Sequence, residues 1–195
     1  MPKAGRISRL KIEEEILPPP PTGQMRIRVK AVGLNFADIF ACLGLYGATP
    51  KGAFTPGLEF SGLVEAIGPN VTDFCPGDRV YGVTRFGAYA SHLNSPSYFV
   101  RKLPDSWSFE EGASFVVQGL TAWHGLVGLG HLNPGETVLV HSAAGGVGLH
   151  AMDICQKRGA LAIGTVGSHE KVDFLMEKCK LRRSQVLVRE SGRKR

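Results

Sequence analysis

The sequence has 195 residues, 43% of them apolar, and a formal net charge of +6. This length allows one large or two small domains with an ample core. No stretch is long or apolar enough to cross a membrane, and the N-terminus lacks the apolar core of a signal peptide, so we expect a soluble, cytoplasmic protein. The four cysteines lie far apart without a Cys-x-x-Cys pair, which argues against a zinc knuckle and a disulfide framework.

The positive charge is concentrated near the end of the chain, and no aromatic residues are interleaved with it. No nucleic-acid fold signature accompanies it, so a solvated basic tail is the favoured interpretation and we expect no nucleic-acid partner. The residues of this tail are Arg182, Arg183, Arg189, Arg193, Lys194 and Arg195.

The first half of the chain has the pattern of short strands separated by turn residues. Arg26–Val32 alternates charged and apolar residues, as a half-exposed strand does. Glycines at irregular spacing in Gly57–Gly68 are typical of bulges and bends in a small curled sheet. Arg79–Val83 and Gly87–Leu93 are further expected strands, and Asn35–Leu43 is an expected short helix. Together these elements predict a compact, mostly β domain.

The composition changes after this region. Ser108 and Glu111 form a capping-box pattern, with a hydroxyl at the N-cap and a carboxylate three residues later. The pattern predicts a helical stretch that reaches about Leu129. We place the domain boundary within this stretch, which gives domains of residues 1–122 and 123–195.

A strand, a turn of small residues and a helix follow from residue 137. Thr137–Val140 has the apolar run of a buried parallel strand, and Leu149–Arg158 has a helical pattern. Between them, Gly145 and Gly148 fit the last two positions of the dinucleotide fingerprint G-x-G-x-x-G, although Ala143 holds the first position. A pyrophosphate would bind at the N-terminus of that helix.

The pattern continues as a β-α-β-α-β unit. Gly159 is placed to end the first helix, and Leu161–Val166 is a second expected strand. Ser168 can cap a second helix, and Gln185–Val188 resembles a third strand. Dinucleotide binding is therefore favoured over a glycine-rich turn in an ordinary α/β domain.

Five short stretches, taken together, resemble one known family. The order of a mostly β domain, a helical linker and a degenerate Rossmann unit is similar to the medium-chain dehydrogenase/reductase superfamily, and the stretches resemble its zinc-free quinone oxidoreductase branch. The resemblance implies an α/β plus mostly-β fold, in which a groES-like β domain of residues 1–122 precedes an incomplete Rossmann-like parallel-sheet domain of residues 123–195. It also implies NADPH as cofactor and the reduction of quinones or α,β-unsaturated carbonyls. The stretches are Gly33-Leu34-Asn35-Phe36-Ala37-Asp38, Pro56-Gly57-Leu58-Glu59-Phe60-Ser61-Gly62, Pro76-Gly77-Asp78-Arg79-Val80, Gly119-Leu120-Thr121-Ala122-Trp123 and Val140-His141-Ser142-Ala143-Ala144-Gly145-Gly146-Val147-Gly148.

Departures from the zinc alcohol dehydrogenases of this superfamily agree with that branch. Those enzymes have Gly-His-Glu where this chain has Gly57-Leu58-Glu59, and no cysteine occupies the usual ligand position ahead of Asp38. Because a catalytic zinc needs three protein ligands, we expect no metal. Without a Lewis acid, conjugated acceptors of hydride are favoured over simple alcohols as substrates.

The resemblance assigns three residues to the substrate side of the nicotinamide pocket: Asn35, Asp38 and Tyr46. Tyr46 is the best candidate for hydrogen bonding or protonating the reduced oxygen, because a phenol is both a donor and an acid. The alternative is a loop tyrosine packed on Phe36 or Phe54. Asn35 and Asp38 are equally suited to a helix start, where Asn and Asp are favoured.

The resemblance also assigns the cofactor contacts. Thr121 would contact the nicotinamide amide, although a helical threonine often only hydrogen-bonds its own turn. Ser168 and Lys171 would favour NADPH, since no carboxylate stands at the end of the second nucleotide strand. Ser168 as a plain N-cap and Lys171 as a surface charge are the alternatives, and Glu170 pointing inward would weaken the preference. The residues of the glycine turn itself are Ala144, Gly145, Gly146, Val147 and Gly148.

The family normally has further strands before Gly5 and after Arg195, so we expect a chain truncated at both ends. An incomplete parallel sheet leaves an open edge and uncovered faces. A catalytically silent homologue that binds nucleotide or partners is therefore the alternative to an enzyme. Dimerisation through the nucleotide domain is common in such families, so a homodimer stays open, although the strands usually involved are absent here.

Overall fold

The computed structural model describes residues 1–189; Arg193, Lys194 and Arg195 of the expected basic tail lie outside the described residues. The chain divides into two compact units, Met1–Val117 and Gln118–Arg195. The functional boundary between residues 122 and 123 stays a prediction from the sequence. Each unit is built around its own cluster of buried apolar side chains, so each is described by itself.

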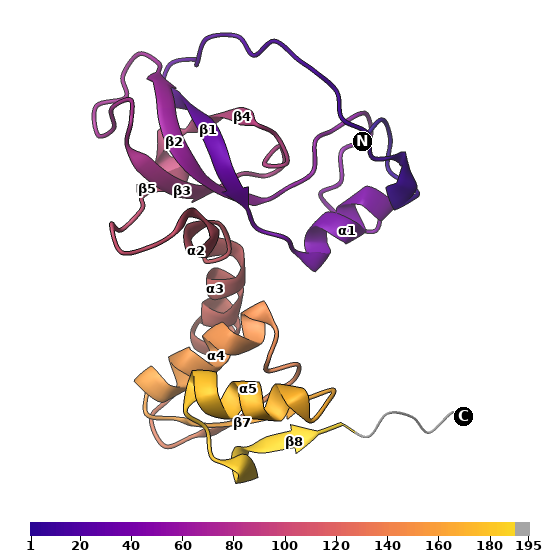
Figure 1. Cartoon of the computed structure of the whole chain (residues 1–195), viewed down its shortest axis with the longest axis vertical. Coiled ribbons are helices and arrows are strands. Elements are labelled where there is room, and N and C mark those ends of the chain that lie inside the picture. The colour runs from indigo at the N-terminus through magenta and orange to yellow at the C-terminus, as the bar shows by residue number, and fades with distance from the viewer. Residues whose placement is uncertain (190–195) are drawn as a thin grey trace. The chain divides into compact units, whose positions relative to one another are not determined.

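The first unit contains a 5-stranded antiparallel sheet with the order β4-β1-β2-β3-β5 (Figure 1). The long central pair, β1 and β2, changes register twice, as expected for a curled sheet with bulges. This arrangement confirms the expected mostly β domain. The strands are β1 (Gln24–Val32), β2 (Glu59–Ile67), β3 (Arg79–Val83), β4 (His92–Pro96) and β5 (Val100–Lys102).

The core of this sheet is made by side chains that alternate along the strands. In β1, Met25 and Ile27 are fully buried while the arginines between and after them are not, which confirms the half-exposed strand. Phe60 of β2 and Val80 of β3 pack into the same cluster. The apolar positions therefore fix which face of the sheet is inside.

The expected strand over Gly87–Leu93 is wrong, because β4 spans His92–Pro96. Gly87 has a φ of 106°, which turns the chain away from an extended path. The N–H of Ala88 then donates to the carbonyl of Gly57 (3.2 Å) in place of a sheet ladder. This part of the chain therefore returns beside the loop that precedes β2.

Helical segments follow two of the expected signals. The helix α1 (Phe36–Leu43) begins after Asn35, as expected. Ser108 and Glu111 form the expected capping box, with bonds of 2.8 and 3.1 Å, ahead of α2 (Phe109–Ala113). The helical stretch then continues as α3 and a π-helical turn. These further segments are η1 (Ile7–Arg9), η2 (Ser97–Phe99), α3 (Val116–Trp123) and η3 (His124–Leu129).

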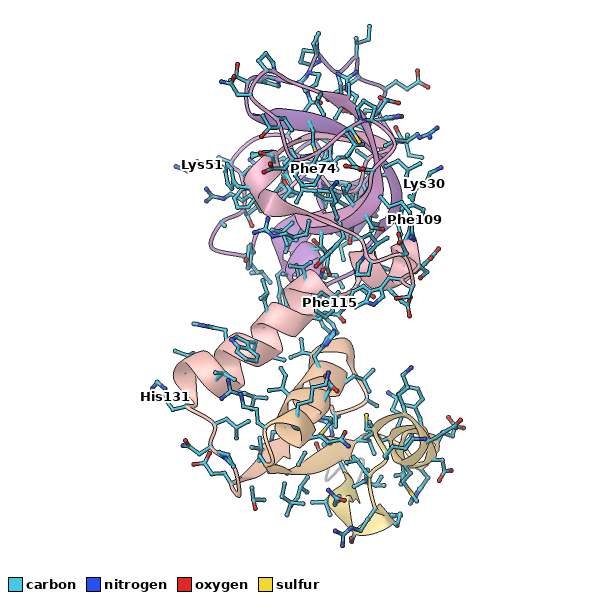
Figure 2. The ribbon with its side chains drawn as sticks, turned by 90° about the vertical axis from the view of Figure 1, so that its left-hand side faces the viewer. Lys30, Lys51, Phe74, Phe109, Phe115 and His131 are labelled. Atoms are coloured by element: carbon cyan, nitrogen blue, oxygen red, sulfur yellow. The ribbon has the colours of Figure 1, made fainter. Side chains whose placement is uncertain are left out.

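An aromatic cluster and one arginine hold α2 against the sheet. The ring of Phe115 lies 4.9 Å from that of Trp107 and 6.2 Å from that of Tyr81, centroid to centroid. Arg79 lies 5.0 Å above the ring of Phe109, and its guanidinium also donates to the carbonyl of Trp107. Figure 2 shows Phe109 and Phe115 on the segment around α2. The start of α3 is thereby fixed to the first unit.

The second unit contains a 3-stranded parallel sheet with the order β6-β7-β8. Helices α4 and α5 connect its strands and lie on one face of the sheet (Figure 1). This is the expected β-α-β-α-β unit, and Gly159, with a φ of 71°, ends α4 as expected. The elements are β6 (Thr137–Val140), α4 (Gly146–Lys157), β7 (Leu161–Val166), α5 (Glu170–Cys179), η4 (Arg183–Gln185) and β8 (Val186–Val188).

Two expectations about this unit's helices are wrong. The first helix begins at Gly146 instead of Leu149, because the small residues of the turn are themselves helical. Ser168 is not the N-cap of α5: His169 holds that position, in a helical conformation and without a side-chain cap bond. Backbone geometry, rather than a hydroxyl, starts this helix.

The expectation that β6 is buried is also wrong for most of its length. Of its four residues, only Val140 is buried, and Leu139 is 54% exposed. Leu161 of β7 and Leu187 of β8 are exposed as well, on the face away from α4 and α5. In the described residues, this sheet is covered on one face only.

Gly62 provides a test of the close approach between β1 and β2. A Cβ added at Gly62 would lie 2.2 Å from the carbonyl oxygen of Arg28. We expect Gly62→Ala to lower the free energy of unfolding by about 1–3 kcal/mol in urea denaturation, because the strands must separate. Gly47→Ala is the matched control, since a Cβ there meets nothing within 4 Å. Equal stability of the two variants would contradict the close approach.

Candidate functional site

A fully buried carboxylate, Glu59, lies at the start of β2. Its Oε1 accepts a hydrogen bond from Nδ2 of Asn35 (2.8 Å), and its Oε2 accepts one from the N–H of Val117 (2.8 Å). Burial raises the pKa of Glu59, while these two hydrogen bonds oppose the rise. Glu59 therefore joins β2, the start of α1 and the start of α3.

A second buried carboxylate, Asp38, lies in the first turn of α1. Its Oδ2 accepts bonds from the N–H of Asn35 (2.8 Å) and the hydroxyl of Tyr89 (3.0 Å). Its Oδ1 is buried and has no hydrogen-bond partner among the described residues. Burial and the charge of Asp38 raise the pKa of Tyr89, so this phenol stays protonated and donates.

These bonds form one network of four side chains in the first unit, which we call the carboxylate network. It consists of Asn35, Asp38, Glu59 and Tyr89. Asn35 is held twice, by its backbone N–H and by its side chain. Two roles were expected for Asp38 from the sequence: a residue of the helix start and a residue of the substrate pocket. The structure is compatible with both, because Asp38 caps α1 and lies beside Asn35.

Tyr46 lies outside the carboxylate network. It follows α1 in an exposed loop, with 38% of its surface accessible. Among residues 1–189 its ring forms no ring pair, and Phe54 instead pairs with Phe86 at 5.4 Å. The structure therefore brings Asn35 and Asp38 together and leaves Tyr46 apart, on a partly exposed loop.

The glycine turn of the second unit connects β6 to α4. The N–H of Ala143 donates to the carbonyl of Thr165 at the end of β7 (3.0 Å). A Cβ added at Gly148 would lie 2.6 Å from the Cα and carbonyl oxygen of Ala143, so only glycine allows this packing. The turn is thus held close to the end of β7.

The start of α4 has the donors that an anion requires. Its first intrahelical bond runs from the N–H of Leu149 to the carbonyl of Gly145 (2.8 Å). The N–H groups of Gly146, Val147 and Gly148 precede this bond and point out of the helix end. A Cβ at Gly145 would meet only the carbonyl oxygen of Ser142, at 3.2 Å. These residues fit a phosphate at a helix N-terminus.

The remaining predicted cofactor residues belong to the same unit. Thr121 lies exposed on α3, one turn after Gln118, whose side chain occupies the space where a Cβ of Gly146 would be. Ser168 is half-buried between β7 and α5, and Lys171 is exposed in the first turn of α5. Their roles toward a cofactor stay predictions.

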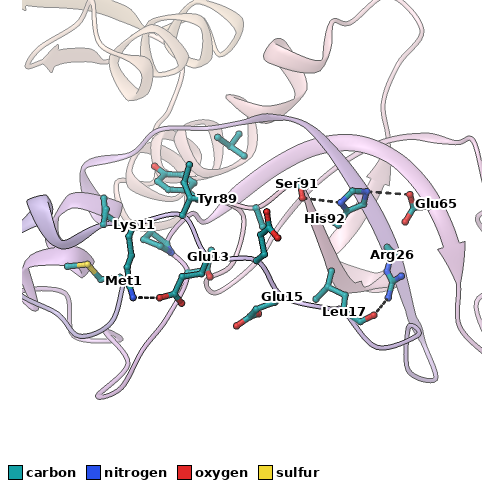
Figure 3. Close-up of a pocket in the computed structure, with 17 residues that line it drawn as sticks. Met1, Lys11, Glu13, Glu15, Leu17, Arg26, Glu65, Tyr89, Ser91 and His92 are labelled. Atoms are coloured by element: carbon teal, nitrogen blue, oxygen red, sulfur yellow. Dashed lines mark hydrogen bonds and ion pairs between the residues drawn. The ribbon is translucent and has the colours of Figure 1, made fainter.

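Two cavities lie elsewhere. One of about 1030 Å³ is formed between residues 10–17 of the N-terminal segment and the sheet of the first unit (Figure 3). Tyr89 lines it, as does His92, which lies 3.4 Å from Glu65. A hollow of about 480 Å³ lies beside β6 in the second unit. None of Asn35, Asp38, Tyr46 or the glycine turn lines either one.

In residues 1–189, no three or more His, Cys, Asp or Glu side chains gather as metal ligands would. Within the same part of the chain, no helix has the length and apolar character to span a membrane.

Residues 21–105 match the model of the alcohol dehydrogenase GroES-like domain. The rat synaptic vesicle membrane protein VAT-1 homolog is 38% identical over 169 residues, which are 87% of this chain and 42% of that protein. Escherichia coli quinone oxidoreductase, solved in complex with NADPH, superposes with a TM-score of 0.83 at 34% identity, covering 91% of this chain and 54% of that one. The CurK enoyl reductase superposes with a TM-score of 0.86 at 32% identity, covering 97% and 58%.

Residues 21–105 are thus a GroES-like domain, and the similarities support the expected place of the chain in the medium-chain dehydrogenase/reductase superfamily. Within that superfamily, the chain is similar to the VAT-1 homologues and quinone oxidoreductases. The GroES-like domain and the partial Rossmann-like sheet expected from the sequence are confirmed. The chain spans less than half of the length of the rat relative.

Two members of the carboxylate network were not predicted from the sequence. Glu59 entered only as part of the Gly57-Leu58-Glu59 motif, and Tyr89 fell within the strand wrongly expected over Gly87–Leu93. A signal was present for Glu59, since a lone carboxylate among small and apolar residues is buried with partners. No comparable signal marks Tyr89.

The raised pKa of Glu59 predicts a pH dependence of stability. As the pH rises, Glu59 loses its proton near its ordinary pKa of about 4.5 in the unfolded chain, and at a higher pH in the folded chain. Stability due to this group is therefore greatest below pH 4.5 and falls as the pH rises through the folded pKa. We expect the free energy of unfolding of wild type, minus that of Glu59→Gln, to fall with rising pH in urea titrations from pH 4 to 8. A constant difference would refute this account.

Proposed function

We propose that the protein is a zinc-independent, NADPH-dependent oxidoreductase that reduces quinones or α,β-unsaturated carbonyls by hydride transfer. The observation that carries this proposal is the glycine turn at the start of α4, in a chain similar to a quinone oxidoreductase solved with NADPH. Likeness to the CurK enoyl reductase supports the conjugated carbonyl class.

The second unit would hold the cofactor. The N–H groups at the start of α4 and the residues Ala144–Gly148 fit the pyrophosphate, because the turn offers donors and no side chain at Gly145. Thr121 would orient the nicotinamide amide, and Ser168 and Lys171 would bind the 2′-phosphate. NADPH supplies the hydride, and the residues of this unit bind and orient it.

The first unit would bind the substrate carbonyl. Glu59 engages one hydrogen of the Asn35 amide, which leaves the second hydrogen for a ligand. Asp38 fixes the backbone of Asn35, so the amide has little freedom to turn away. Tyr46, which is 38% exposed, would hydrogen-bond or protonate the reduced oxygen.

The residue at position 58 supports a zinc-independent reaction. Leu58 offers no ligand atom where zinc alcohol dehydrogenases have histidine, and Asn35 stands at the start of α1 where a cysteine ligand would be needed. A conjugated acceptor does not require a Lewis acid, because it delocalises the charge of the added hydride. This favours quinones and enones over simple alcohols.

The second candidate function is a catalytically silent homologue that binds nucleotide or partners. The exposed leucines Leu139, Leu161 and Leu187 on the uncovered face of the second sheet favour it. A cytoplasmic location and a homodimer belong to the main proposal as expectations from the sequence.

A titration with NADPH, and separately with NADH, followed by fluorescence at matched ionic strength, separates the two functions. We expect saturable binding that prefers NADPH and weakens about five- to tenfold in Ser168→Ala and Lys171→Ala, because each loses a phosphate contact. Lys178→Ala, in the last turn of α5, is the matched control. A folded chain that binds neither nucleotide is not a reductase.

The role of Tyr46 is tested by its phenylalanine variant. We expect Tyr46→Phe to lower kcat for quinone reduction about 10- to 100-fold with unchanged NADPH affinity, since the variant lacks a proton donor. Tyr98→Phe, which changes an exposed tyrosine of η2, serves as control. Full activity of Tyr46→Phe would return Tyr46 to the role of a plain loop residue.

A further inference from the structure

Arg189 follows β8 and is tied to the end of β7. Its N–H donates to the carbonyl of Val166 (2.8 Å), which continues the parallel pairing of the two strands. Its guanidinium lies near Gly167, the residue after Val166. A Cβ added at Gly167 would lie 3.8 Å from Nη2 of Arg189. The guanidinium therefore lies directly beside Gly167.

This position is at the carboxyl edge of the parallel sheet, where the glycine turn also lies. The N–H of Ala143 in the turn donates to the carbonyl of Thr165, two residues before Gly167. His141 is linked to the same threonine, with 3.1 Å between its Nδ1 and Oγ1 of Thr165. Ligands of such sheets bind outside the carboxyl ends of the strands.

No acidic side chain among residues 1–189 forms an ion pair with Arg189. Within residues 1–189 its side chain has no hydrogen-bond or ion-pair partner. The strand end beside it, from Thr165 to Ser168, contains no carboxylate, and the first one after that strand end, Glu170, begins α5. Glu190, which follows Arg189 in the sequence, lies outside the described residues. Gly167 adds no side chain to block access. An anion at this edge therefore meets a guanidinium with which no residue of the described range pairs.

We propose that Arg189 binds the 2′-phosphate of NADPH and sets the preference for NADPH over NADH. This inference rests on the proposed function, and it adds a residue to Ser168 and Lys171. A guanidinium suits this task because its planar donors bind two phosphate oxygens at once. Arg189 is therefore distinct from the solvated basic tail to which the sequence assigned it.

The other described arginines of that tail lie at the opposite edge of the sheet. Arg182 and Arg183 precede β8, at its amino end, where the sheet offers no dinucleotide turn. Arg182 is exposed and carries the same charge. It provides a control that separates a local contact from the general positive charge of this segment.

The test is a pair of fluorescence titrations, with NADPH and with NADH, on the full chain and on Arg189→Gln, Arg189→Lys and Arg182→Gln. We expect Arg189→Gln to raise the Kd for NADPH about tenfold and that for NADH less than twofold, because one charged phosphate contact is lost. Arg189→Lys should lie between, and Arg182→Gln should match wild type. Displacement by 2′,5′-ADP should weaken in parallel in Arg189→Gln.

The outcomes separate this inference from the proposed function. Wild type that prefers NADPH, with an unchanged preference in Arg189→Gln, overturns the role of Arg189 and leaves the reductase proposal standing. An equal loss for both nucleotides in Arg189→Gln also overturns it, since the residue would then only support the fold. Folded wild-type protein that binds neither nucleotide overturns both. Circular dichroism of each variant checks that the fold is retained.

Discussion

The buried carboxylate of Glu59 is the constraint on which the first unit depends. Its two oxygens accept from Asn35 and Val117, so one side chain fixes the entry of α1 and the entry of α3 relative to β2. Burying a carboxylate is costly unless its lone pairs are used, and here both oxygens are used. The position of Asn35 is thus set by a residue that itself faces no solvent.

Local patterns in the sequence predicted those parts of the fold that depend on local physics. The capping box of Ser108 and Glu111 needs only four residues, and the strand Thr137–Val140 needs only its run of apolar and β-branched side chains. The prediction of a strand over Gly87–Leu93 was wrong because Ala88 hydrogen-bonds to Gly57, which is far away in the sequence. The prediction that Ser168 caps α5 was wrong because the N-cap is His169, which has a helical conformation.

The residues of the candidate site likewise fall into those that local motifs predict and those that only long-range contacts reveal. Asn35, Asp38 and the glycine turn stand in short motifs, so resemblance to a family was enough to select them. Glu59 and Tyr89 join the network across 24 and 51 residues of sequence, which no local pattern records. Arg189 lay hidden among other basic residues, and only the pairing of β8 with β7 separates it from them.

The one-sided second sheet has a thermodynamic consequence. Leu139 and Leu187 keep about half of their surface exposed, so these leucines stabilise the second unit less than fully buried leucines would. A ligand that binds only the folded unit adds to the free energy of unfolding of that unit. A dinucleotide bound at the carboxyl edge of the sheet would therefore stabilise this unit, and the stabilisation would grow with the ratio of its free concentration to its Kd.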